Sequence, residues 1–341
     1  MNLYTTIEIP PSPIHLDWTK NLLFVGSCFA ENISKRFAER KFPSMANPFG
    51  VLYNPLSIER LMENAASGKI YTEEDVFFDG ELWHCWDAHS SFSRKNKKEC
   101  LENLNAALDT FRKHLPKIDI AFITLGSAFV YFLKDADKNY PANTVVSNCH
   151  KASPETFIRK RISVEQAILS LKNIAAILRS QNPKIQIVCT VSPLRHFKDG
   201  APENSVSKAT LLLAIHEFIR NHSDFAEYFP AYEIVMDELR DYRFYAQDMI
   251  HLSEVAEDYI FERFMDSHTD AAFSQNLLRV EKFLKAASHR IINSESPKIQ
   301  EFAQKHLVLA QALSASIPGL DLNEEMKFFE KLLRENFSFP L

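Results

Sequence analysis

The strongest constraint on the fold is a change in the period of the hydrophobic pattern at Gly26. Residues Leu22–Val25 form a continuous apolar run, which is typical of a central strand buried on both faces. Beyond Ser27, apolar residues recur every four positions, as on one face of an amphipathic helix, at Phe29, Ile33 and Phe37. The pattern predicts a strand, a sharp turn that holds Ser27, and a helix.

The same alternation of strand-like and helix-like segments continues along the chain. The patterns predict strands at 42–47, 118–125, 185–191 and 232–236, and helices at 57–66, 101–115, 164–181, 208–221 and 251–264. A hairpin with an Asp-Gly turn is expected at 75–86, and a looser polar region at 134–154. Alternating strands and helices favour an α/β fold, a three-layer α/β/α sandwich with a parallel sheet. Sites in such sheets form beyond the carboxyl ends of the strands.

The last part of the chain has a different character. From about Asp270 only helical periodicity is found, in segments 273–292, 297–317 and 323–336. We therefore expect two parts: an α/β domain over residues 1–269 and a C-terminal helical extension over 270–341, whose helices serve packing.

Composition excludes several classes of partner. The net charge of −5 is spread over interspersed acidic and basic residues, so neither nucleic acid nor a membrane surface is an expected partner. The N-terminus lacks the basic and apolar regions of a signal peptide, and five scattered cysteines without a Cys-x-x-Cys motif suit a reducing compartment. These features predict a cytoplasmic protein.

Ser27 has two possible roles. It could be a nucleophile whose oxyanion is held by the N–H groups at the start of the following helix, or simply the N-cap of that helix. A nucleophile needs a base and an orienting acid. Asp248 and His251 offer both, three residues apart and after the last expected strand. His196, just beyond another strand end, is the rival base or else a loop histidine.

The five residues Gly26-Ser27-Cys28-Phe29-Ala30 resemble the signature of the GSCFA family, a branch similar to the SGNH (GDSL-type) hydrolases. The resemblance covers roughly residues 22–264. It implies a serine esterase or acyl hydrolase in which Ser27 is the nucleophile, His251 the base and Asp248 its orienting acid. It also implies that the N–H of Gly50 joins the oxyanion hole.

One family feature is missing. The third sequence block normally reads Gly-x-Asn, with the asparagine donating to the oxyanion, but here it reads Gly126-Ser127-Ala128. Because the loss of one such donor costs about 3 kcal/mol, another group should replace it. Asn148 is the first candidate, followed by Ser127 and His150.

A second cluster combines aromatic and metal-capable residues, between Trp83 and His89. Successive strand residues point to opposite faces and cannot all bind one ion, so no metal site is predicted. The aromatic rings are expected either to line a binding wall, such as one for sugar rings, or to pack in the core.

Together these features predict a serine esterase of SGNH type, without metal or organic cofactor. Its expected substrate is a small acyl ester, such as an acetyl ester, on a carbohydrate or related metabolite. Two other functions stay open: an acyltransferase that uses the same serine, and a non-catalytic carbohydrate-binding or scaffold protein. Neither the acyl group nor the oligomeric state follows from the sequence.

Overall fold

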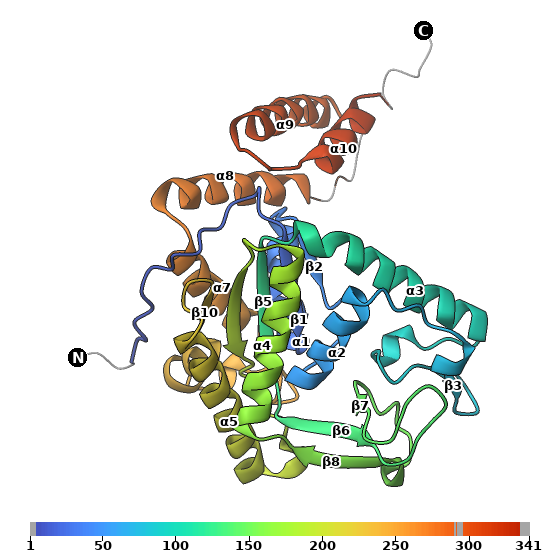
Figure 1. Cartoon of the computed structure of the whole chain (residues 1–341). Helices are drawn as coiled ribbons and strands as arrows, with labels where there is room; N and C mark the ends of the chain where they lie inside the picture. Colours follow the sequence, from blue (N-terminus) through green and yellow to red (C-terminus); the bar gives the residue numbers. More distant parts are fainter. Residues whose placement is uncertain (1–4, 290, 292–295, 335–341) are drawn as a thin grey trace. The chain divides into compact units, whose positions relative to one another are not determined.

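The computed structural model describes residues 5–289, 291 and 296–334 (Figure 1). Its centre is a parallel sheet in the order β10-β9-β5-β1-β2. The strands are β1 (Leu22–Gly26), β2 (Ser44–Ala46), β5 (Ile120–Leu125), β9 (Gln186–Val191) and β10 (Ala226–Tyr228). All residues of β1 and β5 are buried, which confirms the predicted central strand and the α/β class.

Helices flank this sheet. Those of the α/β part are α1 (Cys28–Glu39), α2 (Pro55–Ala66), α3 (Lys97–His114), α4 (Val164–Gln181) and α5 (Ala201–Arg220). Asn54 caps α2 and Ser163 closes a capping box on α4, so polar side chains satisfy the first N–H groups of both helices. Figure 1 shows α2, α4 and α5 lying next to one another along the sheet.

The order of the strands determines where a site can form. The connection from β1 through α1 leads outward to β2, whereas the next connection returns past β1 to β5, and the chain then continues to β9 and β10. Because parallel crossovers are right-handed, α1 covers one face and α2 to α5 the other. The strand order therefore reverses between β1 and β5, where ligands bind in open α/β sheets.

The chain between the main strands carries smaller elements. A hairpin of β3 (Phe77–Phe78) and β4 (Trp83–His84) confirms the predicted Asp-Gly turn. A second sheet pairs β6 (Phe129–Leu133) with β7 (Val145–Val146) and β8 (Phe157–Arg161). Of these three strands only β7, which is two residues long, lies within the looser region expected at 134–154. Short 3-10 helices lie at Glu73–Asp75, Ser90–Phe92, Leu115–Lys117, Pro154–Thr156, Phe197–Asp199 and Tyr242–Phe244.

One predicted strand is wrong. Residues 232–236 belong to α6 (Ala231–Glu233) and a π-helical turn (Ile234–Glu238), and the last strand is instead β10. The residues buried there, Ala231, Ile234, Val235 and Glu238, recur at helical spacing. A short apolar run is compatible with either a strand or a helix. The helical spacing of the buried residues shows that this run is helical.

The chain divides into two compact units. The first holds Leu22–Ser34 and Ser44–Phe261 with residues up to Ile9, and contains the sheets. The second combines Pro10–Asn21 and Lys35–Pro43 with the described residues from Glu262 onward. The helical extension expected from the sequence, residues 270–341, did not include these two early segments.

Helices dominate the second unit. After α7 (Glu254–His268), which begins in the first unit, come α8 (Ala271–Ala287), α9 (Pro297–Ser316) and α10 (Asn323–Arg334). Trp18 stacks on Phe273 and Phe42 within this unit, with ring centroids 4.5 and 5.4 Å away. Among the described residues, no helix is long and apolar enough to cross a membrane.

Candidate active site

The turn after β1 depends on a glycine. Gly26 has φ +143°, and a Cβ there would lie 2.1 Å from the carbonyl oxygen of Thr124 on β5. The Gly26 N–H donates to Asn47 Oδ1 at 2.9 Å, which ties the turn to the segment after β2. Ser27 is thereby held between β1 and α1, at the point where the strand order reverses.

Asp248 and His251 form a hydrogen-bonded pair. Asp248 Oδ2 lies 2.6 Å from His251 Nδ1, and Asp248 Oδ1 accepts the backbone N–H groups of Ile250 and His251, each at 2.9 Å. The hydrogen bond from His251, reinforced by these N–H groups, lowers the pKa of Asp248 to about 2. The carboxylate stays ionised over any ordinary assay range and fixes the orientation of the imidazole.

The other nitrogen of His251 reaches the turn after β1 at the residue next to Ser27. His251 Nε2 lies 3.6 Å from Cys28 Sγ. The Ser27 hydroxyl is buried and has no hydrogen-bond partner in the part of the chain that the structure describes. Burial raises the pKa of the Cys28 thiol, although the N–H groups of Cys28 and Phe29 work in the opposite direction. The sulfur is therefore held as a thiol, and the histidine is within one residue of the expected nucleophile.

A cavity of about 330 Å³ opens at this turn. Its walls come from the carboxyl ends of β1, β5 and β9, from the small sheet, and from α5. The lining residues are Ser27, Cys28, Val51, Tyr53, Gly126, Ser127, Phe129, Tyr131, Cys149, Arg159, Ser192, His196, Lys198, Asp199 and Asn204. Aromatic side chains of β6 and the Arg159 guanidinium of β8 thus line the same cavity as Ser27.

Some of the predicted oxyanion residues are not brought to this cavity. Gly50, Asn148 and His150 are not among its lining residues. The Gly50 N–H donates to Asn47 O at 2.7 Å, and Asn148 Oδ1 accepts the His150 N–H at 2.8 Å. The His150 ring lies 2.8 Å from the carbonyl of Cys85, and its burial lowers its pKa to about 4. These groups serve local turns and the core.

Besides Ser27, three predicted residues line the cavity, namely Gly126, Ser127 and His196, but their contacts limit the roles that they can have. The backbone N–H groups of Gly126 and Ser127 both donate to Tyr53 O, at 2.7 and 3.1 Å, and so are already engaged. His196 has its ring centroid 6.2 Å from that of His251, and its pKa is lowered, first by burial and then by the charge of Lys208. The rival histidine therefore stands beside the Asp248–His251 pair.

Lys208 is a buried residue that the sequence analysis missed. Its Nζ donates to Gly126 O at 2.7 Å and Ser192 O at 2.6 Å, linking the ends of β5 and β9 beneath the cavity. Burial, followed by the charge of Arg195, lowers the pKa of Lys208 to about 7. Ser207 beside it accepts the Ala128 N–H at 2.8 Å. Polar residues at Asn204, Ser207 and Lys208 have the spacing of one helix face, and this was the available signal.

The aromatic cluster at 83–89 packs in the core instead. Trp86 is buried and stacks on Phe77 with ring centroids 3.8 Å apart, and no residue of the cluster lines the cavity. His84 lies 2.8 Å from Asp79 and 2.7 Å from Ser93. Within the described part of the chain, no three His, Cys, Asp or Glu side chains gather as metal ligands.

Comparison with known proteins gives a clear family match. The model of the GSCFA family matches residues 21–264, and that of the GSCFA domain protein, C-terminal domain, matches residues 280–335. The comparison with curated proteins gives no match.

Two solved structures show a weak likeness. One is a carbohydrate esterase family 3 from Talaromyces cellulolyticus, at 7% identity and TM-score 0.32, covering 79% of this chain and 94% of that one. The other is the acetyl xylan esterase Est2A from Butyrivibrio proteoclasticus, at 9% identity and TM-score 0.35, covering 75% of this chain and 64% of that one.

Proposed function

The chain belongs to the GSCFA family, and we propose that it is an ester hydrolase in which Ser27 is the nucleophile, His251 the base and Asp248 its orienting acid. The observation that carries this proposal is that the Asp248–His251 pair reaches the Ser27–Cys28 turn, which lines the cavity, although Asp248 and His251 are not themselves lining residues. A nucleophile, a base and an orienting carboxylate are what acyl transfer requires, and here they come from two segments, the turn after β1 and the turn at 248–251.

The proposed reaction has two steps. His251 Nε2 takes the hydroxyl proton as Ser27 Oγ attacks the ester carbonyl, and the tetrahedral intermediate collapses when His251 returns that proton to the leaving alcohol. Water then attacks the acyl-serine with the same proton relay, which releases the acid and restores the hydroxyl. Each step needs His251 Nε2 within hydrogen-bond reach of Ser27 Oγ, a place that the Cys28 sulfur occupies in this structure.

The oxyanion requires donors that are not already bonded. The first N–H groups of a helix have no intrahelical partner. Those of Cys28 and Phe29 lie close enough to the Cys28 sulfur to stabilise its thiolate. We assign them to the oxyanion in place of the missing asparagine, since the N–H groups of Gly50, Gly126 and Ser127 donate to carbonyls.

The substrate of this proposal is a small acyl ester, such as an acetyl ester, on a carbohydrate or related metabolite. The family resemblance implies this class, and the aromatic wall formed by Phe129 and Tyr131 suits it. An acyltransferase with the same serine would need a second acceptor for turnover, and a binding or scaffold protein would show no reactive serine.

One observation favours a second candidate nucleophile, the Cys28 thiol. It is the side chain that His251 Nε2 contacts, at 3.6 Å. Its raised pKa opposes this role, because the thiolate is the reactive form of cysteine. A thioester intermediate on Cys28 would favour transfer to an acceptor over hydrolysis.

Labelling with a fluorophosphonate probe, followed by peptide mapping, tests the nucleophile without a known substrate. We expect the adduct on Ser27, no labelling of Ser27→Ala, and retained labelling of Cys28→Ala. Ser192→Ala is the matched control, because Ser192 is another buried serine of the cavity whose hydroxyl has no hydrogen-bond partner among the described residues, and this variant should still be labelled. Labelling that survives in Ser27→Ala and disappears in Cys28→Ala would reverse the assignment.

A further inference from the structure

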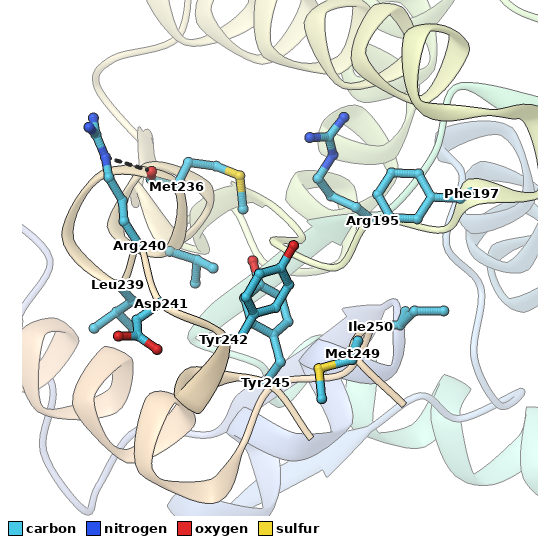
Figure 2. Close-up of a pocket in the computed structure, with 11 residues that line it drawn as sticks. Arg195, Phe197, Met236, Leu239, Arg240, Asp241, Tyr242, Tyr245, Met249 and Ile250 are labelled. Carbon is cyan, nitrogen blue, oxygen red and sulfur yellow. Dashed lines mark hydrogen bonds between the residues drawn. The ribbon is translucent and has the colours of Figure 1, made fainter. Parts of the chain in front are cut away.

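A second cavity, of about 310 Å³, lies beside the turn that carries Asp248 and His251 (Figure 2). It shares no lining residue with the cavity at Ser27. Its lining includes two arginines, an aspartate, two tyrosines, a phenylalanine and two methionines, among them Arg195, Phe197, Asp241, Tyr242, Tyr245 and Met249.

One chain segment, residues 195–199, contributes side chains to both cavities and separates them. Along residues 195–199, Arg195 and Phe197 line the second cavity, whereas His196, Lys198 and Asp199 line the first. Met249 lies between the two members of the Asp248–His251 pair, and its φ of +59° belongs to the tight turn closed by Asp248. A ligand in the second cavity therefore contacts the residues next to the proposed base.

The second cavity is lined by exposed apolar and aromatic side chains. Tyr242 is 77% exposed, Met249 53% and Phe197 49%, an unusual degree of exposure for such large groups. The Tyr242 and Tyr245 rings overlap in the view of Figure 2, and their centroids are 6.2 Å apart. An aromatic wall of this kind offers a stacking face to a ring-shaped ligand.

Arg195 gives the cavity an uncompensated positive charge. Its guanidinium donates to Asn204 Oδ1 at 3.1 Å, to Ser205 Oγ at 2.7 Å and to Ala201 O at 3.4 Å, all neutral acceptors. No carboxylate of the described residues forms an ion pair with it, whereas Arg240 on the opposite side is paired with Asp237 at 2.8 Å. Asp241, the acidic lining residue, lies 3.9 Å from Arg243.

We propose that this second cavity binds a sugar ring that carries a carboxylate. The tyrosine wall stacks on the ring, and Arg195 pairs with the carboxylate through charge-assisted hydrogen bonds. The class of ligand is therefore a uronic acid or a similar acidic sugar.

A long acyl chain fits the cavity less well. It would cover the charged Arg195 guanidinium and the phenol groups of Tyr242 and Tyr245, and within the described residues these two phenol groups form no hydrogen bond. Buried polar groups left without partners cost free energy. A polyhydroxylated acidic ring supplies acceptors to all of them.

The test measures binding rather than turnover, in full-length protein with Ser27→Ala. The probes are methyl α-glucuronide, methyl α-glucoside, which has the same ring without the carboxylate, and acetate, which has the carboxylate without the ring. We expect titration calorimetry to show the glucuronide binding about 10-fold or more tightly than either of the others. Arg195→Met should bring the glucuronide to within about 2-fold of the glucoside, while Tyr242→Ala should weaken both sugars about 3- to 10-fold.

Controls separate this site from general charge effects and from the nucleophile. Arg220→Met removes an exposed arginine paired with Glu217 at the far end of α5, and should bind the glucuronide as before. Arg195→Lys keeps the charge and should retain part of the preference. Equal binding of glucuronide and glucoside, equal binding of acetate, or a similar loss in Arg220→Met would each overturn the proposal. Fluorophosphonate labelling of Ser27 needs no sugar, so failure of the esterase proposal appears separately.

Discussion

The buried lysine beneath the cavity gives the sharpest quantitative prediction. Replacing Lys208 by Met keeps the approximate volume of the side chain but removes both its hydrogen bonds, to Gly126 O and Ser192 O, and its titration. Above pH 10.5, where the amine is neutral in both the folded and the unfolded protein, the variant should be less stable by about 2 kcal/mol, from two lost hydrogen bonds of about 1 kcal/mol each.

The pH dependence follows from the shifted pKa. Burial lowers the pKa of Lys208 from 10.5 to about 7, so between these values the unfolded chain binds a proton that the folded protein does not. The free energy of unfolding of the wild type therefore rises with pH across this window, by up to about 1.4 kcal/mol per pH unit. Because the amine is half protonated near pH 7, the gain from pH 7 to pH 9 is about 2 kcal/mol.

Lys208→Met lacks this contribution, so its stability relative to the wild type should be lower at pH 9 than at pH 7 by about 2 kcal/mol. Urea unfolding followed by tryptophan fluorescence at both pH values measures the difference, since Trp83 and Trp86 report on the α/β unit. Lys184→Met, at an exposed lysine, is the control and should follow the wild type at both pH values. A deficit of the same size at pH 7 and pH 9 would refute the reasoning, because it would mean that Lys208 does not titrate in this range.

Two further predictions concern the reaction. Asp248→Asn should lower kcat by about 10³- to 10⁴-fold, because an amide that bonds to Nδ1 no longer holds the imidazole in the proton-accepting form; steady-state hydrolysis of a small aryl acetate measures this, and a loss below 10-fold would remove Asp248 from the relay. Asn148→Ala should change kcat in the same assay less than about 2-fold, because Asn148 lies outside the cavity lining; a 10²-fold loss would instead return it to the oxyanion site.

Local sequence patterns predicted the elements that carry the proposed catalytic residues. The period change at Gly26 predicted β1, the turn and α1, because burial on both faces of a strand and on one face of a helix leaves different spacings in the sequence. The three-residue spacing of Asp248 and His251 placed both groups in one turn, where they form the expected hydrogen bond. Both features join residues that are close along the chain.

Contacts between distant segments were decided by the tertiary structure alone. The sequence could not show that His251 meets Cys28 across 223 positions, or that the N–H groups of Gly126 and Ser127 are taken by Tyr53. Nor could it show that Lys208 is buried under two strand ends, since a lysine between apolar helix positions is ordinarily solvated. Hydrogen-bond partners and desolvation depend on which segments pack together, and that packing is set by the whole chain rather than by any local pattern.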